Sequence, residues 1–174
     1  ARFVIERGRR VGLVDVLPAG CVTAGRAGQR LAHLDELWAA GVRVFSDDGD
    51  CVADAGLLRR ALEYLGDVGG VISQHAEDRG LSGGGQMHEG EVSSLLGLAG
   101  IPAAAEEVVV ARDLAVLRLA GGRYHVQHAS TAGTVALVRA AKAEGLAVTA
   151  EVAPHHLAFD HALLRGTDPV FKMY

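Results

Sequence analysis

Side chains that can bind metal ions follow four apolar runs of this sequence. They are Asp47–Asp48, His75 with Glu77 and Asp78 after it, His128, and His155–His156. A carboxylate with two or three imidazoles is a ligand set that suits zinc. Because parallel strands place their C-terminal ends at one edge of a sheet, these groups are expected to converge there. The pattern therefore predicts a metal site built from segments that are far apart in the sequence.

Each of these residues also has an ordinary structural interpretation. Either Asp47 or Asp48 can serve only to cap the turn before Gly49, as Asp often does. A single His at a strand end is usually a hydrogen-bonded residue of the core or rim, and we expect this of His125. His88 and His161 lie in loop-like sequence and are expected at the surface. The recurrence of metal-binding types at several strand ends favours the metal site.

The elements that must position these groups alternate along the chain. Apolar runs predict strands at 11–18, 42–46, 70–75, 124–127 and 146–153, and helical spacing predicts helices at about 31–38, 54–65, 105–120 and 130–145. Nearly all-apolar strands alternating with helices predict an α/β fold with a parallel sheet. Both open doubly wound sheets and (β/α)8 barrels produce this pattern, and five units are too few to close an eight-stranded barrel. The Gly-rich, polar segment 79–104 predicts a long surface excursion.

Composition excludes several classes of function. The 174 residues are 49% apolar and 22% charged, with a formal net charge of −4, so no basic surface favours nucleic acid. No apolar stretch approaches a membrane-spanning length, and the start of the chain has no signal-peptide pattern, so a cytoplasmic protein is expected. Cys21 and Cys51 lack CxxC spacing, which disfavours a structural thiolate zinc site. Neither GxGxxG nor a P-loop occurs, so nucleotide-phosphate binding is not expected.

Several motifs, in order, resemble those of the bacterial class I dihydroorotases of the amidohydrolase superfamily. They are FSDDG (45–49), QHAED (74–78), GGGQMHEGEVSSLLGLAGIPAAAEEVVVARD (83–113), YHVQHAST (124–131), GLAVTAEVAPHHL (145–157) and FKM (171–173). The resemblance implies a (β/α)8 TIM-type barrel of the metal-dependent amidohydrolase type, with zinc at the strand C-termini. Only about the third to seventh strand–helix units would be present. Residues 1–174 would then be the central part of one catalytic barrel domain.

The resemblance also implies a ligand set. The metal ligands of the family fall on Asp48, His75 and His128, and the carboxylate of Asp48 would bridge two Zn²⁺ ions per complete site. Hydantoinases and allantoinases carry a carboxylated lysine at that place. Asp47 would then cap the turn. The residue that follows Lys–Met in the family is a substrate-binding Asn, and Tyr174 stands there in this sequence.

Two elements of the family pattern are missing from the given sequence. No HxH motif precedes Asp48, and the Asp expected as both ligand and acid–base group would lie beyond Tyr174. No catalytic acid–base residue is therefore expected within the chain. We expect the 174 residues alone to be inactive and to lack a normal binuclear centre.

The function implied is the reversible, zinc-dependent cyclisation of N-carbamoyl-L-aspartate to dihydroorotate in pyrimidine biosynthesis. One alternative is a non-catalytic dihydroorotase-like subunit that scaffolds aspartate transcarbamoylase, which the absent HxH motif keeps open. A second is another cyclic-amide hydrolase of the hydantoinase or allantoinase type, which the Asp at position 48 disfavours. The expected partners are the small-molecule substrate, with aspartate transcarbamoylase and a homo-oligomer as further expectations of the resemblance.

Overall fold

A five-stranded parallel sheet forms the centre of the computed structural model, which describes residues 1–171 and Met173. The expectation for Tyr174 lies outside the described residues. The strands are β1 (Ala19–Gly20), β2 (Val44–Phe45), β3 (Val71–Gln74), β6 (Arg123–Val126) and β7 (Val148–Ala150). They lie side by side in chain order, β1-β2-β3-β6-β7, and every pair is parallel. A doubly wound sheet reverses its strand order, whereas a barrel wall does not, so this order favours a barrel wall.

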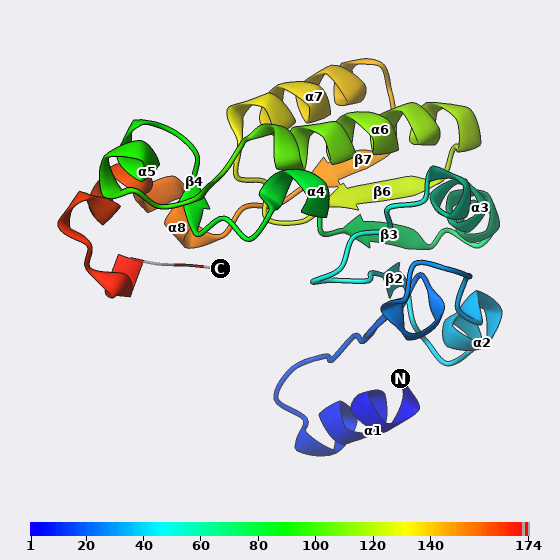
Figure 1. Ribbon diagram of the computed structural model, residues 1–174. Helices are drawn as coiled ribbons and strands as arrows, with labels where there is room; N and C mark the ends of the chain where they lie inside the picture. The colour runs from blue at the N-terminus through cyan, green and yellow to red at the C-terminus, as the bar shows by residue number, and fades with distance from the viewer. Residues whose placement is uncertain (172, 174) are drawn as a thin grey trace.

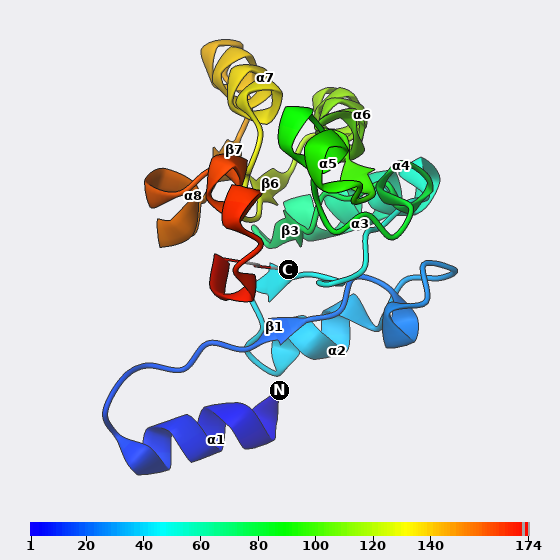
Figure 2. The ribbon, with the colours of Figure 1, turned by 60° about the vertical axis from the view of Figure 1, so that its left-hand side comes forward.

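Helices follow the strands and cover one side of the sheet. They are α2 (Leu34–Ala39), α3 (Ala55–Gly66), α6 (Ala104–Ala120) and α7 (Ala132–Ala143). Figure 2 shows the strands succeeding one another along a curve, with these helices on its outer side. Asp54 caps α3 by accepting a hydrogen bond from the Leu57 backbone N–H at 2.7 Å, and Thr131 caps α7 in the same way. The predicted helices are confirmed within a few residues.

The core lies between the sheet and its helices. Ile72, Tyr124 and Val126 of the strands pack against buried leucines and valines of α3 and α6, which are Leu58, Leu62, Val110, Leu114 and Leu117. Burial of each such side chain contributes about 1.5–3 kcal/mol. This packing fixes the strands laterally, and so fixes the spacing of the side chains at their C-terminal ends.

The segment that was expected as a surface excursion contains short elements of its own. They are α4 (Arg79–Ser82), β4 (Met87–His88), α5 (Glu91–Leu96) and β5 (Gly100–Ile101), and β4 and β5 form a separate two-stranded parallel sheet. After β7 come α8 (Pro154–Ala158), η2 (His161–Gly166) and η3 (Pro169–Phe171). In Figure 1 this last segment lies beside α5, at one end of the sheet. Among the described residues, no helix is long and apolar enough to cross a membrane.

The predicted strand at residues 11–18 is wrong. Helix α1 (Arg2–Val11) occupies the start of the chain and ends at Gly12, whose φ is 71°. Residues 13–18 form no strand, and Leu13, Val14 and Leu17 are largely exposed. The first strand begins only at Ala19, after Pro18, and η1 (Ala24–Arg26) follows it. The apolar run was misleading because most of its side chains stay exposed, and the partly covered Val16 lies against Gly8 of α1.

Candidate metal centre

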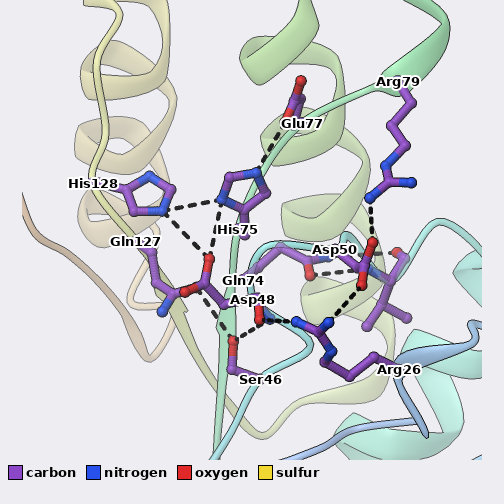
Figure 3. A network of polar contacts seen from close by, with 11 residues as sticks. Arg26, Ser46, Asp48, Asp50, Gln74, His75, Glu77, Arg79, Gln127 and His128 are labelled. Atoms are coloured by element: carbon purple, nitrogen blue, oxygen red, sulfur yellow. Dashed lines mark hydrogen bonds and ion pairs between the residues drawn. The ribbon is translucent and has the colours of Figure 1, made fainter. Parts of the chain in front are cut away.

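Asp48, His75 and His128 meet at the C-terminal ends of β2, β3 and β6, three neighbouring strands of the sheet. One ligand atom from each residue lies within 4.8 Å of the other two. Figure 3 shows the three side chains pointing toward one another. No second group of three or more potential ligands lies this close in the part of the chain that the structure describes. The structure thus brings together three of the strand-end groups that the sequence singled out.

The separations within this cluster suit a shared metal ion. His75 Nδ1 lies 3.2 Å from Asp48 Oδ1 and 3.1 Å from His128 Nε2, and His128 Nε2 lies 3.8 Å from Asp48 Oδ1. Metal–ligand bonds of roughly 2.0–2.2 Å in tetrahedral geometry place neighbouring ligand atoms about 3.4 Å apart. The donor chemistry and the spacing therefore both fit a divalent cation, with two imidazoles and one carboxylate as ligands.

The loop after β2 holds Asp48 through its backbone. The Asp48 N–H donates to Ser46 Oγ at 3.1 Å, and the Asp48 carbonyl accepts from Arg26 Nη1 at 2.7 Å. Arg26 also lies 3.6 Å from a carboxylate oxygen of Asp50, which in turn pairs with Arg79. These contacts involve only the backbone of Asp48, and its carboxylate Oδ1 faces both imidazoles (Figure 3).

Asp47 has a different role from the turn cap that the sequence predicted. Its carboxylate is 2% exposed and accepts from the backbone N–H groups of Val22 and Thr23, at 2.8 and 3.1 Å, and from the Thr23 hydroxyl. Within the turn itself, only the Asp47 carbonyl is used, accepting from the Asp50 N–H at 2.6 Å. Because side chains alternate along a strand, Asp47 shares the buried side of Phe45 and reaches the loop after β1. Its side chain therefore ties β2 to the β1 loop and does not cap the turn.

Glu77 is the partner of the second ring nitrogen of His75. His75 Nε2 lies 3.0 Å from Glu77 Oε2, while Nδ1 faces the cluster. A hydrogen bond from Ser82 and the proximity of His75 hold the pKa of Glu77 below its ordinary value, although burial opposes them. A carboxylate on the outer nitrogen of a metal-binding imidazole fixes the tautomer and orientation of the ring. The sequence placed Glu77 near His75, but the spacing did not show which nitrogen it would meet.

His128 is held in an unusual backbone conformation. Its φ is 32°, on the left-handed side, which is uncommon for a residue with a Cβ. On one side the Gln127 N–H donates to the Gln74 carbonyl at 3.1 Å, and on the other the Ala129 N–H donates to the Glu151 carbonyl at 2.8 Å. Residues in such conformations persist where surrounding contacts enforce them, and they occur often at functional sites.

The remaining histidines lie outside the cluster. The rings of His155 and His156 pack edge to face, with their centroids 4.1 Å apart. His156 Nδ1 accepts a hydrogen bond from the Ala153 backbone N–H. Burial lowers the pKa of His156, and the neighbouring His155 and His128 lower it further. His125 Nδ1 lies 2.7 Å from Thr149 Oγ1, so it is a hydrogen-bonded rim residue as expected. His88 is exposed, as expected, and stacks on His161, which is half-buried.

Comparison with known proteins identifies the family to which this chain is similar. The family described as "Dihydro-orotase-like" matches residues 2–134. The chain is 52% identical over 162 residues to the dihydroorotase of Pelotomaculum thermopropionicum, covering 93% of this chain and 38% of the relative. It is also 52% identical over 172 residues to the dihydroorotase of Mycobacterium tuberculosis, covering 98% and 40%. The chain therefore spans about two fifths of the length of the curated relatives it matches.

Solved structures agree on the fold. The L-hydantoinase (dihydropyrimidinase) of Arthrobacter aurescens superposes with a TM-score of 0.73 at 22% identity, covering 98% of this chain and 40% of that one. A D-hydantoinase superposes with a TM-score of 0.66 at 20% identity, covering 89% and 35%. The parallel sheet is accordingly part of an amidohydrolase-type (β/α)8 barrel, as the resemblance implied. The chain belongs to the dihydroorotase-like family.

Proposed function

We propose that the complete protein is a dihydroorotase, which interconverts N-carbamoyl-L-aspartate and dihydroorotate in pyrimidine biosynthesis in the cytoplasm. The observation that carries the proposal is the convergence of Asp48, His75 and His128 at one edge of a barrel sheet, in a chain 52% identical to dihydroorotases. We propose zinc as the metal, since two imidazoles and a carboxylate suit it. The Asp at position 48 favours this activity over that of hydantoinases, for which the resemblance would require a lysine.

The residues of the cluster would have separate tasks. His75 and His128 would each give a ring nitrogen to the metal, and Asp48 has a second oxygen with which it can reach a second ion. A metal held here supplies Lewis acidity toward the cyclic amide and lowers the pKa of water. Glu77 would keep the outer nitrogen of His75 protonated, so that Nδ1 stays available as a ligand.

Acid should abolish activity through the ligands. An imidazole must be neutral to bind a metal, so protonation of His75 or His128 competes with metal binding. The leaving nitrogen needs a proton from a separate group, and none of the three clustered residues is free to give it. We propose that this group, and the remaining metal ligands, belong to parts of the barrel outside the 174 residues.

The test is hydrolysis of dihydroorotate by the complete protein, followed by the loss of its ultraviolet absorbance, together with zinc analysis. The His128→Ala variant should lose both zinc and turnover, whereas the exposed His88→Gln should keep both. A complete protein without metal and without turnover would refute the proposal. It would favour the scaffold role with aspartate transcarbamoylase, which otherwise stays a prediction, as does the oligomeric state.

A further inference from the structure

A buried polar network lies directly behind the metal cluster, between the sheet and α6. At its centre is Asp113 of α6, which is 0% exposed. Asp113 Oδ2 accepts from the Tyr124 hydroxyl at 2.6 Å and from Gln74 Nε2 at 2.9 Å, and Oδ1 accepts from Arg112 Nε at 2.7 Å. Gln74 and Tyr124 are each 1% exposed. Four polar side chains are thus joined in a layer that is otherwise apolar.

The same network grips the loop that carries Asp48. Gln74 Oε1 accepts from the Val52 N–H at 3.1 Å. Arg112 donates to the Val52 carbonyl at 2.7 Å and to the Ala53 carbonyl at 2.6 Å. Val52 follows Asp48 by four residues, and Gln74 immediately precedes His75. One set of hydrogen bonds therefore spans the two segments that deliver a carboxylate and an imidazole to the cluster.

Packing alone does not account for this network. Burial of a carboxylate, an amide and a phenol is costly unless each is hydrogen-bonded, and apolar residues of similar size are often as stabilising. Burial accordingly raises the pKa of Asp113, against the opposing effect of Arg112, Tyr124 and Gln74. What hydrogen bonds add over apolar contacts is direction, because they fix distance and angle between the groups they join. Here they join the Asp48 loop to the end of β3, and Tyr124 of β6 donates to the same carboxylate.

We propose that Asp113 is a positioning residue for the metal centre, which acts through Gln74 and Arg112 to fix Asp48 relative to His75. The inference rests on the proposed function, because it assumes that these two residues bind a metal. Loss of the network would leave the three ligand side chains themselves unchanged. The loop after β2, which carries Asp48, would no longer be held at a fixed position relative to the end of β3. The metal would then be bound more weakly and in a less regular geometry.

Cobalt(II), added to the metal-free complete protein, tests this inference. Its affinity is measured by competition with a chelator, and its visible absorption spectrum reports the ligand geometry. We expect Gln74→Met and Asp113→Asn to weaken cobalt binding about tenfold or more, as loss of outer ligand contacts does elsewhere. The spectrum of the bound ion should also change in both variants.

Leu65→Ala serves as the control for stability. Leu65 is buried at the end of α3, where its carbonyl accepts from the Gly70 N–H just before β3, at the end of the strand opposite His75. It should lower the thermal midpoint without changing cobalt affinity or spectrum. If Asp113→Asn does not fold, the Arg112→Gln variant is used to test the inference. The Arg112 side chain is partly exposed and holds the loop from the surface side, so its replacement is expected to disturb folding less.

Three results would overturn the inference. Cobalt affinity could fall in proportion to stability in every variant, Leu65→Ala included. The folded Gln74→Met and Arg112→Gln variants could bind cobalt with wild-type affinity and spectrum. Finally, a wild-type protein that bound no cobalt would overturn the proposed function along with this inference, and the wild-type titration identifies that case.

Discussion

At the scale of single residues, Asp47 and Asp48 are adjacent carboxylates with unrelated partners. The two-residue alternation of a strand separates them, since Asp47 continues the buried side of Phe45 and Asp48 the open side of Ser46. The sequence could predict that Asp48, His75 and His128 converge, because parallel strands end at one edge. It could not predict the partners of Asp47, which lie 24 and 25 residues away on another loop.

Removal of the Glu77 side chain tests the support that it gives to His75. In the complete protein, Glu77→Ala should weaken metal binding about 10- to 100-fold, because the outer nitrogen of His75 loses its acceptor. Chelator competition measures this directly. Glu63→Ala is the matched control, since Glu63 pairs with Arg59 on the exposed side of α3, away from the cluster. Equal affinity in the two variants would show that Glu77 does not support the ligand.

At the scale of elements, the alternation of apolar runs and helical spacing predicted most of the sheet and its helices. It failed at residues 11–18, where exposed apolar residues mimic a strand. It also gave no sign of β4 and β5, because two-residue strands have too little periodicity to detect. The buried network around Asp113 could not be predicted for another reason. Apart from the adjacent pair Arg112 and Asp113, its contacts join residues 11 to 60 positions apart, and they depend on side-chain rotamers.

The close approach of α3 to the start of β6 predicts how much stability is lost when an alanine replaces Gly122. Gly122 has a φ of +90°, and a Cβ there would lie 2.9 Å from the Leu62 carbonyl oxygen of α3. Gly145, at the end of α7, has a similar φ of +85° but open space around it. Gly145→Ala should cost about 1–2 kcal/mol of unfolding free energy from its left-handed backbone alone. Gly122→Ala should cost at least about 1 kcal/mol more, as overpacking does.

Urea unfolding of the two alanine variants measures this difference. Because both positions have a similar positive φ, an alanine has a similar backbone strain at either one. The difference between the two losses of unfolding free energy therefore isolates the collision of the alanine at position 122 with α3. Equal losses of stability would mean that α3 moves aside at no cost, and that the packing of α3 on the sheet is looser than the structure indicates.

At the scale of the whole molecule, five strands of a barrel wall are present, and β1 and β7 each have one neighbour among the described residues. Sheet edges of this kind expose backbone groups that pair with further strands. The sequence predicted five units. This number is explained by the comparison with relatives, because the chain spans only about two fifths of their length. We propose that the metal centre is correspondingly partial here, with the three clustered side chains as its ligands.

The partial centre predicts weak metal binding by the 174-residue chain alone. Three ligands can hold one ion loosely, but two ions need the ligands of the remaining barrel. Metal analysis after dialysis against a mild chelator should therefore find no stoichiometric pair of ions. A tightly bound pair would contradict the assignment of the missing ligands to other parts of the protein.

We propose above all that Asp48, His75 and His128 bind the catalytic metal of the complete protein. Diffraction from crystals of the complete protein, recorded on both sides of the zinc absorption edge, tests it most directly. We expect anomalous density within bonding distance of Asp48, of His75 Nδ1 and of His128 Nε2, with Glu77 on the outer nitrogen of His75. Zinc bound elsewhere, with these three side chains hydrogen-bonded only to protein or water, would contradict it.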